Sequence, residues 1–177
     1  VKDYQRIIEK NPKAIKAHYN LGMIFTFKLN EPKIALENFN NFLSQAPRHQ
    51  EAFSIAKIMM SLDKPRNKDV YEDPYFQTLF DQAMQTQDLM KRRELLIKGS
   101  PLKPDSPVCD YLTGQTYEME GKSKEAIRYY RMALEKRPTC ASCHLSLGKL
   151  LIKQKKSQEG EMHLLKARLF EPNNKGV

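Results

Sequence analysis

The sequence contains no tryptophan and only three cysteines among its 177 residues. So small and odd a number of cysteines in a chain of this length excludes a small domain held together by a disulfide framework. No apolar run approaches the roughly 20 residues that a membrane-spanning helix requires, and no basic start followed by a short apolar run indicates a signal peptide. We therefore expect no membrane span, and cysteines outside a framework favour a reducing compartment, the cytoplasm.

Catalytic sequence motifs are missing as well. The chain has no GxGxxG or phosphate-binding loop, no HExxH zinc motif and no GxSxG nucleophile motif. Acidic residues are scattered and form no pair on an apolar background. We therefore expect a protein that is not an enzyme and that has no cofactor.

Basic residues outnumber acidic ones, 30 Lys and Arg against 21 Asp and Glu, for a formal net charge of +9. Such an excess can serve acidic partners or nucleic acid. Here, however, Lys and Glu alternate along stretches such as KSKEAIRYYRMALEKR, whereas a nucleic-acid surface usually clusters its positive charge. The pattern indicates solvated helix faces, and we expect no nucleic-acid binding.

The sequence does contain an internal period. Three segments, 15–49, 107–140 and 141–174, align at 35, 34 and 34 residues. They share small residues, aromatic or large apolar residues and a closing proline: Leu21, Gly22, Phe25, Ala35 and Pro47; Gly114, Tyr117, Ala126 and Pro138; Leu147, Gly148, Leu151, Ala167 and Pro172. The small residues let two antiparallel helices cross closely, and the proline prevents the second helix from continuing.

This pattern resembles the tetratricopeptide-repeat family. The resemblance implies an all-α fold, an α-solenoid of antiparallel helical hairpins in that family's right-handed superhelix, with an irregular central segment. It implies one array over residues 1–177, divided into the second helix of a truncated repeat at 1–14, a repeat at 15–49, an irregular helix plus loop at 50–72, a degenerate repeat at 73–106, and repeats at 107–140 and 141–174. An alternative for the degenerate repeat is one long helix over 76–98.

The pentapeptide CASCH, which starts at Cys140, allows several interpretations. CxxCH is the attachment signature of a c-type haem, and a cysteine pair at a helix N-terminus can be redox-active. Zinc would suit the ligand types of Cys109, Cys140, Cys143 and His144. The repeat register favours packing instead, because His18 occupies the position of His144 in the first repeat with no cysteine beside it. We therefore expect no cofactor and no metal, with a redox or haem role through Cys140, Cys143 and His144 as the alternative.

In this family the first helix of each repeat lines the concave groove of the superhelix. The register places there Lys16, Tyr19, Asn20, Met23, Phe27, Tyr111, Gln115, Met119, Lys149 and Lys153. Aromatic and Met side chains are typical anchors of protein interfaces. We therefore predict a protein–protein interaction scaffold or adaptor that binds an extended peptide or a helix of a partner protein in the groove. The alternative is a self-associating assembly module, a homo-oligomer formed through exposed ends of the array.

Overall fold

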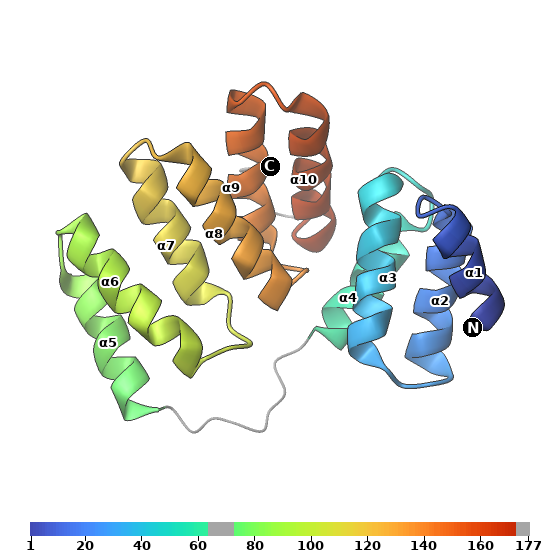
Figure 1. The fold of residues 1–177 in the computed structure, drawn as a ribbon, viewed down its shortest axis with the longest axis horizontal. Coiled ribbons are helices and arrows are strands. Elements are labelled where there is room, and N and C mark those ends of the chain that lie inside the picture. Colours follow the sequence, from blue (N-terminus) through green and yellow to red (C-terminus); the bar gives the residue numbers. More distant parts are fainter. Residues whose placement is uncertain (64–72, 173–177) are drawn as a thin grey trace. The chain divides into compact units, whose positions relative to one another are not determined.

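The computed structural model describes residues 1–63 and 73–172 (Figure 1). Every regular element in these ranges is helical, which confirms the all-α prediction. The elements in chain order are α1 (Lys2–Lys10), α2 (Ile15–Phe27), α3 (Pro32–Gln45), α4 (Ala52–Leu62), α5 (Pro74–Gln85), α6 (Leu89–Gly99), the 3-10 helix η1 (Ser100–Leu102), α7 (Val108–Met119), α8 (Ser123–Lys136), α9 (Ala141–Lys153) and α10 (Ser157–Phe170). None of these helices is long and apolar enough to cross a membrane.

The chain divides into two compact units, one of Val1–Lys64 with Arg168–Val177 and the other of Pro65–Ala167. The first contains α1 to α4, and the second contains α5 to α9 and most of α10. Each unit has its own buried apolar residues, for example Phe39 and Phe42 in the first and Tyr130 and Leu147 in the second.

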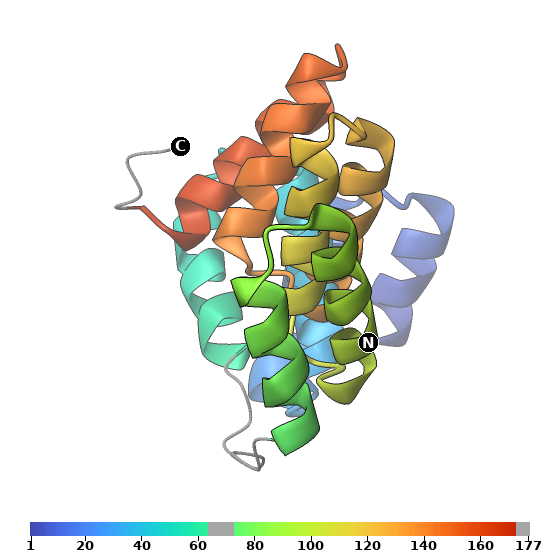
Figure 2. The same ribbon diagram turned by 90° about the vertical axis from the view of Figure 1, so that its left-hand side faces the viewer.

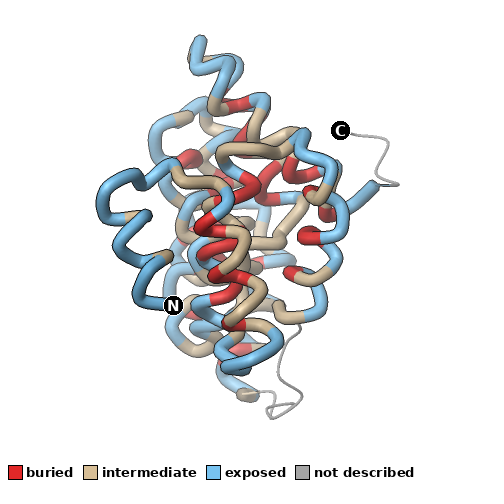
Figure 3. Tube along the Cα trace, turned by 90° about the vertical axis from the view of Figure 1, so that its right-hand side faces the viewer, coloured by how far each residue is buried: buried red, intermediate tan, exposed pale blue. Residues whose placement is uncertain are grey.

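The first unit is built around the α2–α3 hairpin. Helix α1 packs on α2, and helix α4 packs on α3. Gly22 makes the close crossing possible, because a Cβ atom at that position would collide with the ring of Phe39. Phe39 is completely buried. By contrast α1 has no buried residue, and Figure 3 shows it without a buried position beside the label of the N-terminus.

In the second unit the helices α5 to α9 pack side by side in chain order, each on its neighbour (Figures 1 and 2). The crossing of α7 and α8 repeats that of the first unit, since a Cβ atom on Gly114 would lie 2.6 Å from the Tyr130 ring. Consecutive packing of antiparallel hairpins is the arrangement of an α-solenoid. The small residues at the repeat positions therefore stand at helix crossings, as the sequence predicts.

The last hairpin, α9–α10, crosses through two glycines. A Cβ atom on Gly148 would lie 2.9 Å from the carbonyl oxygen of Gly160, and a Cβ atom on Gly160 would lie 2.6 Å from Cγ1 of Ile152. Gly160 stands where the second repeat has Ala126. Its departure from the pattern thus has a steric reason, because even a methyl group would push the two backbones apart.

The degenerate repeat at 73–106 consists of two helices, α5 and α6. The alternative of one long helix over 76–98 is wrong, because the chain leaves the helical path between Gln85 and Leu89. Asp88 caps the new helix, with its carboxylate accepting the backbone N–H groups of Met90 at 2.8 Å and Lys91 at 3.2 Å. Of the segment 50–72, α4 is a helix as expected, whereas residues 64–72 lie outside the described part of the chain.

Candidate functional site

A pocket of about 520 Å³ opens in the second unit, where the first helices of successive repeats lie side by side. Its walls come from α5, α6, α7 and α9. The lining residues are Met84, Arg92, Leu112, Gln115, Thr116, Glu118, Met119, Leu145, Ser146 and Lys149. Three of the predicted groove residues, Gln115, Met119 and Lys149, are therefore brought together at one site.

The apolar part of the pocket comes from four side chains of three helices. Met119, at the end of α7, is 67 % exposed, and Met84 of α5 is 39 % exposed. Leu112 and Leu145 complete this wall and are half-buried. Unbranched Met side chains adapt their shape to what they contact, so this wall can receive an apolar side chain without a rigid fit.

The polar part of the pocket has both charge signs. Glu118 accepts a hydrogen bond of 2.6 Å from the Tyr130 hydroxyl, and burial together with this carboxylate raises the pKa of Tyr130 above its ordinary value. Arg92 donates to the carbonyl oxygens of Ala83 at 3.1 Å and Thr86 at 2.7 Å, which holds its guanidinium against the α5–α6 turn. Lys149 is exposed.

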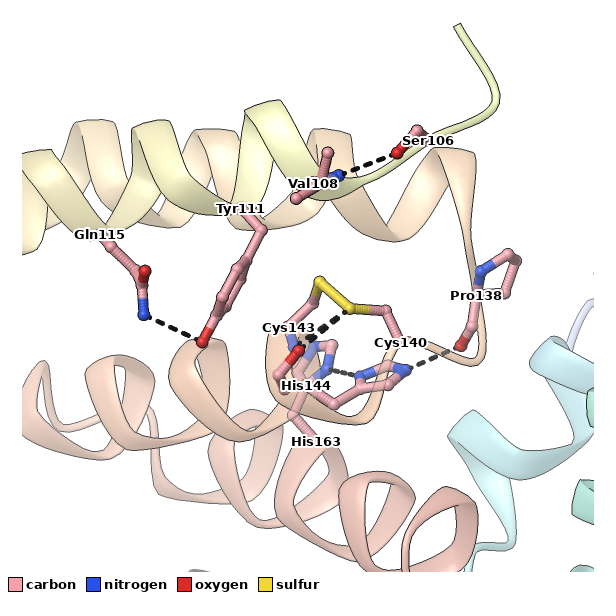
Figure 4. The surroundings of a disulfide bond; sticks show 10 residues. Ser106, Val108, Tyr111, Gln115, Pro138, Cys140, Cys143, His144 and His163 are labelled. Atoms are coloured by element: carbon pink, nitrogen blue, oxygen red, sulfur yellow. Dashed lines mark hydrogen bonds between the residues drawn. A yellow bond between two sulfur atoms is a disulfide. The ribbon is translucent and has the colours of Figure 1, made fainter. Parts of the chain in front are cut away.

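Tyr111 lies on the same helix as the pocket residues but not among them. Its hydroxyl accepts a hydrogen bond of 3.0 Å from Nε2 of Gln115, a contact drawn in Figure 4. Its ring lies 5.7 Å from that of Tyr130 in the core. Tyr111 thus fixes the orientation of the Gln115 amide without itself lining the pocket.

The remaining predicted groove residues lie elsewhere. Lys153 is exposed on the last turn of α9 and does not line the pocket. In the first unit α2 holds a row along one side, of which Phe27 is 67 % exposed and Tyr19 packs its ring 5.9 Å from Phe42. The row consists of Lys16, Tyr19, Asn20, Met23 and Phe27. That these five residues bind a partner stays a prediction.

The pocket residues absent from the predicted groove include Met84 and Arg92, which belong to α5 and α6, two helices with no predicted groove residue. For Met84 the signal is present in the sequence, because it stands 34 residues before the pocket residue Glu118 and so shares its repeat position. The degeneracy of the 73–106 repeat obscures that register. For Arg92 no such signal exists, because it belongs to the second helix of its hairpin, α6, and reaches the pocket across the α5–α6 turn.

The CASCH segment forms the start of α9. Cys140 and Cys143 are joined by a disulfide bond, and Cys140 is the N-cap of the helix, its Sγ atom accepting the N–H of Cys143 at 3.3 Å (Figure 4). The bridge spans three residues and connects no two helices. It is therefore no disulfide framework, although the sequence did not show that the two sulfur atoms would be paired.

His144 has a packing role, as the repeat register predicts. It is 2 % exposed, with Nε2 lying 3.0 Å from the Pro138 carbonyl oxygen and Nδ1 lying 2.7 Å from Nδ1 of His163. In the first repeat His18 makes the equivalent contacts with Pro12 at 3.0 Å and Asn38 at 3.2 Å. At both positions the imidazole connects the preceding proline turn to the second helix of its own repeat.

These contacts do not fit the haem alternative. Covalent attachment of a c-type haem uses both cysteine sulfurs and one imidazole nitrogen of the following histidine. Here the sulfurs bind each other, and both ring nitrogens of the buried His144 are engaged by protein groups.

The zinc alternative has no support either. In the part of the chain that the structure describes, no three His, Cys, Asp or Glu side chains are grouped so as to hold a metal ion. Cys109, a proposed ligand, belongs to a different cluster with Phe76, Ala83 and Leu96. Burial there raises the pKa of its thiol to about 11.

Comparison with known proteins gives two partial sequence matches. The family model described as "Anaphase-promoting complex, cyclosome, subunit 3" matches residues 82–167, slightly less than half of the chain. The anaphase-promoting complex subunit CDC16 of Saccharomyces cerevisiae is 39 % identical over 61 residues, which are 34 % of this chain and 7 % of that protein. The chain thus spans only a small part of the length of this curated relative.

Solved structures of MamA resemble the chain in fold. The MamA RS-1 ArsTM double mutant matches with a TM-score of 0.50 at 15 % identity, over 97 % of this chain and 92 % of the other. MamA 41-end from Desulfovibrio magneticus RS-1 matches with a TM-score of 0.42 at 15 % identity, over 97 % and 84 % of the two chains. At such identities the likeness concerns the fold alone.

Proposed function

We propose that the chain is a protein-interaction scaffold of the tetratricopeptide-repeat type and that it binds an extended segment of a partner protein, without catalysis, in the pocket of its second unit. The partial matches to anaphase-promoting complex subunits support the scaffold role. The observation that carries the proposal is the convergence of Met84, Leu112, Met119 and Leu145 on one hollow. Single exposed apolar residues are normal on a protein surface, whereas a group of them beside fixed polar groups is typical of a binding site.

The pocket suits a partner segment with one apolar anchor side chain. The volume of about 520 Å³ exceeds what one side chain fills, so neighbouring main chain of the segment can enter as well. The exposed ammonium of Lys149 and the oriented amide of Gln115 can donate hydrogen bonds to carbonyl or carboxylate oxygens of that main chain or its side chains.

The test is selection of binding peptides from a displayed library, followed by fluorescence anisotropy with the selected peptide. Met119→Asp puts a charge on the apolar wall, and Lys149→Ala removes the exposed donor. We expect Met119→Asp to weaken binding about tenfold or more. Met90→Asp is the matched control, because Met90 is 63 % exposed on α6 and does not line the pocket.

Three outcomes are distinguishable. Loss of affinity in Met119→Asp but not in Met90→Asp supports the pocket. Equal affinity in both variants, with loss in Phe27→Asp, would move the binding site to the α2 row of the first unit. No selected peptide at all would contradict the proposal, and sedimentation of the same protein then tests the prediction of self-association.

A further inference from the structure

We propose that Cys140 and Cys143 form a reversible redox site, a disulfide that exchanges with dithiols through Cys140. Neither the repeat pattern nor partner binding requires such a bond. The proposal is therefore independent of the pocket and of the function proposed for it.

The position of the bridge argues against a structural role. Both sulfurs belong to the cap and first turn of α9, three residues apart in sequence. The stabilisation that a disulfide gives by restricting the unfolded chain increases with the length of the loop that it closes. A bridge between residues only three positions apart therefore contributes little to the stability of the fold, so structural stabilisation does not explain the bond.

The first turn of α9 is also held without the bond. The backbone N–H of His144 donates to the Cys140 carbonyl oxygen at 3.1 Å, and the N–H of Cys140 donates to the Arg137 carbonyl oxygen at 3.1 Å. The contact between Nε2 of His144 and the Pro138 carbonyl oxygen connects the turn to the previous repeat (Figure 4). Opening the disulfide should therefore leave the helix and the fold intact.

The two sulfurs differ in their accessibility. Cys140 is partly exposed, whereas Cys143 is completely buried. An incoming thiolate must approach the sulfur that it attacks, so exchange begins at Cys140. The N–H of Cys143, which already points at Sγ of Cys140, favours the negatively charged form of that sulfur once it is released.

The exchange takes place in two steps. A thiolate of the dithiol attacks Sγ of Cys140, a mixed disulfide forms, and the Cys140–Cys143 bond breaks with its electron pair going to Cys143, which takes up a proton. The second thiol of the reductant then attacks its partner sulfur in the mixed disulfide and releases Cys140 as a thiolate. In total the dithiol is oxidised to a cyclic disulfide, and the protein gains two electrons and two protons, one of which the Cys140 thiolate takes up in equilibrium with water.

His144 follows Cys143 directly but does not act as the base for this exchange. Its two ring nitrogens face the Pro138 carbonyl oxygen and His163, and it is buried. The third cysteine, Cys109, is 3 % exposed in a separate apolar cluster, so it serves as an internal control for unspecific thiol chemistry.

The experiment uses the full chain in buffers of reduced and oxidised dithiothreitol at varied ratios, followed by alkylation and intact-mass measurement. We expect the disulfide to be reduced under native conditions, so that alkylation in an acidic, denaturing quench modifies three thiols in place of the single thiol of Cys109. The bond should return on reoxidation, and the far-UV circular dichroism should stay unchanged. Release of the thiols only in denaturant, or unfolding upon reduction, would contradict the proposal.

Two single variants test the direction of attack. Cys143→Ser should form a mixed disulfide with oxidised glutathione at Cys140, and Cys140→Ser should react at its remaining Cys143 at least about tenfold more slowly, because that sulfur is buried. Cys109→Ser should exchange like the unaltered protein. Equal rates in Cys143→Ser and Cys140→Ser would overturn the assignment of Cys140 as the attacked sulfur.

Discussion

The Nδ1 atoms of His144 and His163 lie 2.7 Å apart, joining α9 to α10. Burial, followed by the nearby Lys166 charge, lowers the pKa of both imidazoles, that of His163 to about 4. Both rings are therefore neutral at pH 7. Because Nε2 of His144 donates to the Pro138 carbonyl oxygen, its Nδ1 accepts, and the proton between the two rings belongs to His163.

This assignment predicts the effect of removing one ring. His163→Leu deletes the hydrogen bond that His163 donates to the buried Nδ1 of His144, so the free energy of unfolding should fall by about 1–3 kcal/mol. The double variant His144→Leu with His163→Leu removes acceptor and donor together and should lose less than the sum of the single changes. Urea denaturation of the four proteins measures this, and strict additivity would contradict the hydrogen bond between the two rings.

Lys166 predicts a dependence of stability on pH. It is 2 % exposed, and burial lowers its pKa to about 7 from the ordinary 10.5. Between these two values the unfolded chain binds more protons than the folded one, so the free energy of unfolding should rise as the pH rises from about 7 to 10.5. Lys166→Met removes the titrating group and should flatten this dependence.

The matched control for Lys166→Met is Lys149→Met. Lys149 is exposed on the adjacent helix α9, so its replacement removes a positive charge that is already in contact with solvent. Thermal and urea denaturation at pH 7 and pH 9.5 compare the two variants with the unaltered protein. An unchanged slope of stability against pH in Lys166→Met would show that this lysine is not the cause.

The ion pair of Asp110 and Lys136 predicts a large effect of a single charge removal. Nζ of Lys136 lies 2.6 Å from Oδ2 of Asp110, whose side chain is 3 % exposed, and Ser100 donates to the other carboxylate oxygen at 3.0 Å. Lys136→Met leaves a buried carboxylate without this partner and should cost about 3 kcal/mol. Arg131→Met breaks the exposed pair with Glu159, 2.7 Å long, and should cost at most about 1 kcal/mol.

The same pair offers a second check through the double variant Asp110→Leu with Lys136→Met. Replacing both charges with apolar groups restores most of the stability that Lys136→Met alone loses, since a buried pair is costly to desolvate. A double variant as unstable as the single one in urea denaturation would instead show that the pair itself stabilises the fold.

At Gly160 we expect a substitution by alanine to change the stability in the direction opposite to the usual one. In a helix interior Gly→Ala ordinarily stabilises by about 1 kcal/mol. At Gly160, however, the new methyl group would lie 2.6 Å from Ile152 and 2.9 Å from the Gly148 carbonyl oxygen, so Gly160→Ala should destabilise by about 1–3 kcal/mol. Gly99→Ala is the control, because its methyl group would meet its nearest neighbours at 3.6 Å, an ordinary contact distance.

Local features of the repeats could be predicted from the sequence because each depends on residues in one repeat or its neighbour. Gly22 and Gly114 at the helix crossings, and the packing of His18 and His144, follow from positions that recur. The period predicts these contacts, since equivalent positions of successive repeats pack in equivalent surroundings.

Other features depend on contacts between residues that do not recur from repeat to repeat, so the period does not predict them. Asp110 stands at the repeat position of His18 and His144, and only the structure shows how a carboxylate is accommodated there, because Lys136 at the end of the next helix compensates its charge. Likewise the place of Arg92 in the pocket depends on how the α5–α6 turn folds back. The bond between Cys140 and Cys143 depends on the geometry of the first turn of α9, which the spacing permits but does not require.

Arg92 has two tasks that one side chain must share. Its guanidinium closes the α5–α6 turn through the carbonyl oxygens of Ala83 and Thr86, and it also forms part of the pocket wall. A bound partner segment that accepts hydrogen bonds from this guanidinium in place of the two carbonyl oxygens destabilises the turn. A segment that packs against the guanidinium and leaves those hydrogen bonds intact stabilises the turn. Binding in the pocket and the rigidity of the α5–α6 hairpin are thus linked quantities, and a change in either must appear in the other with equal free energy.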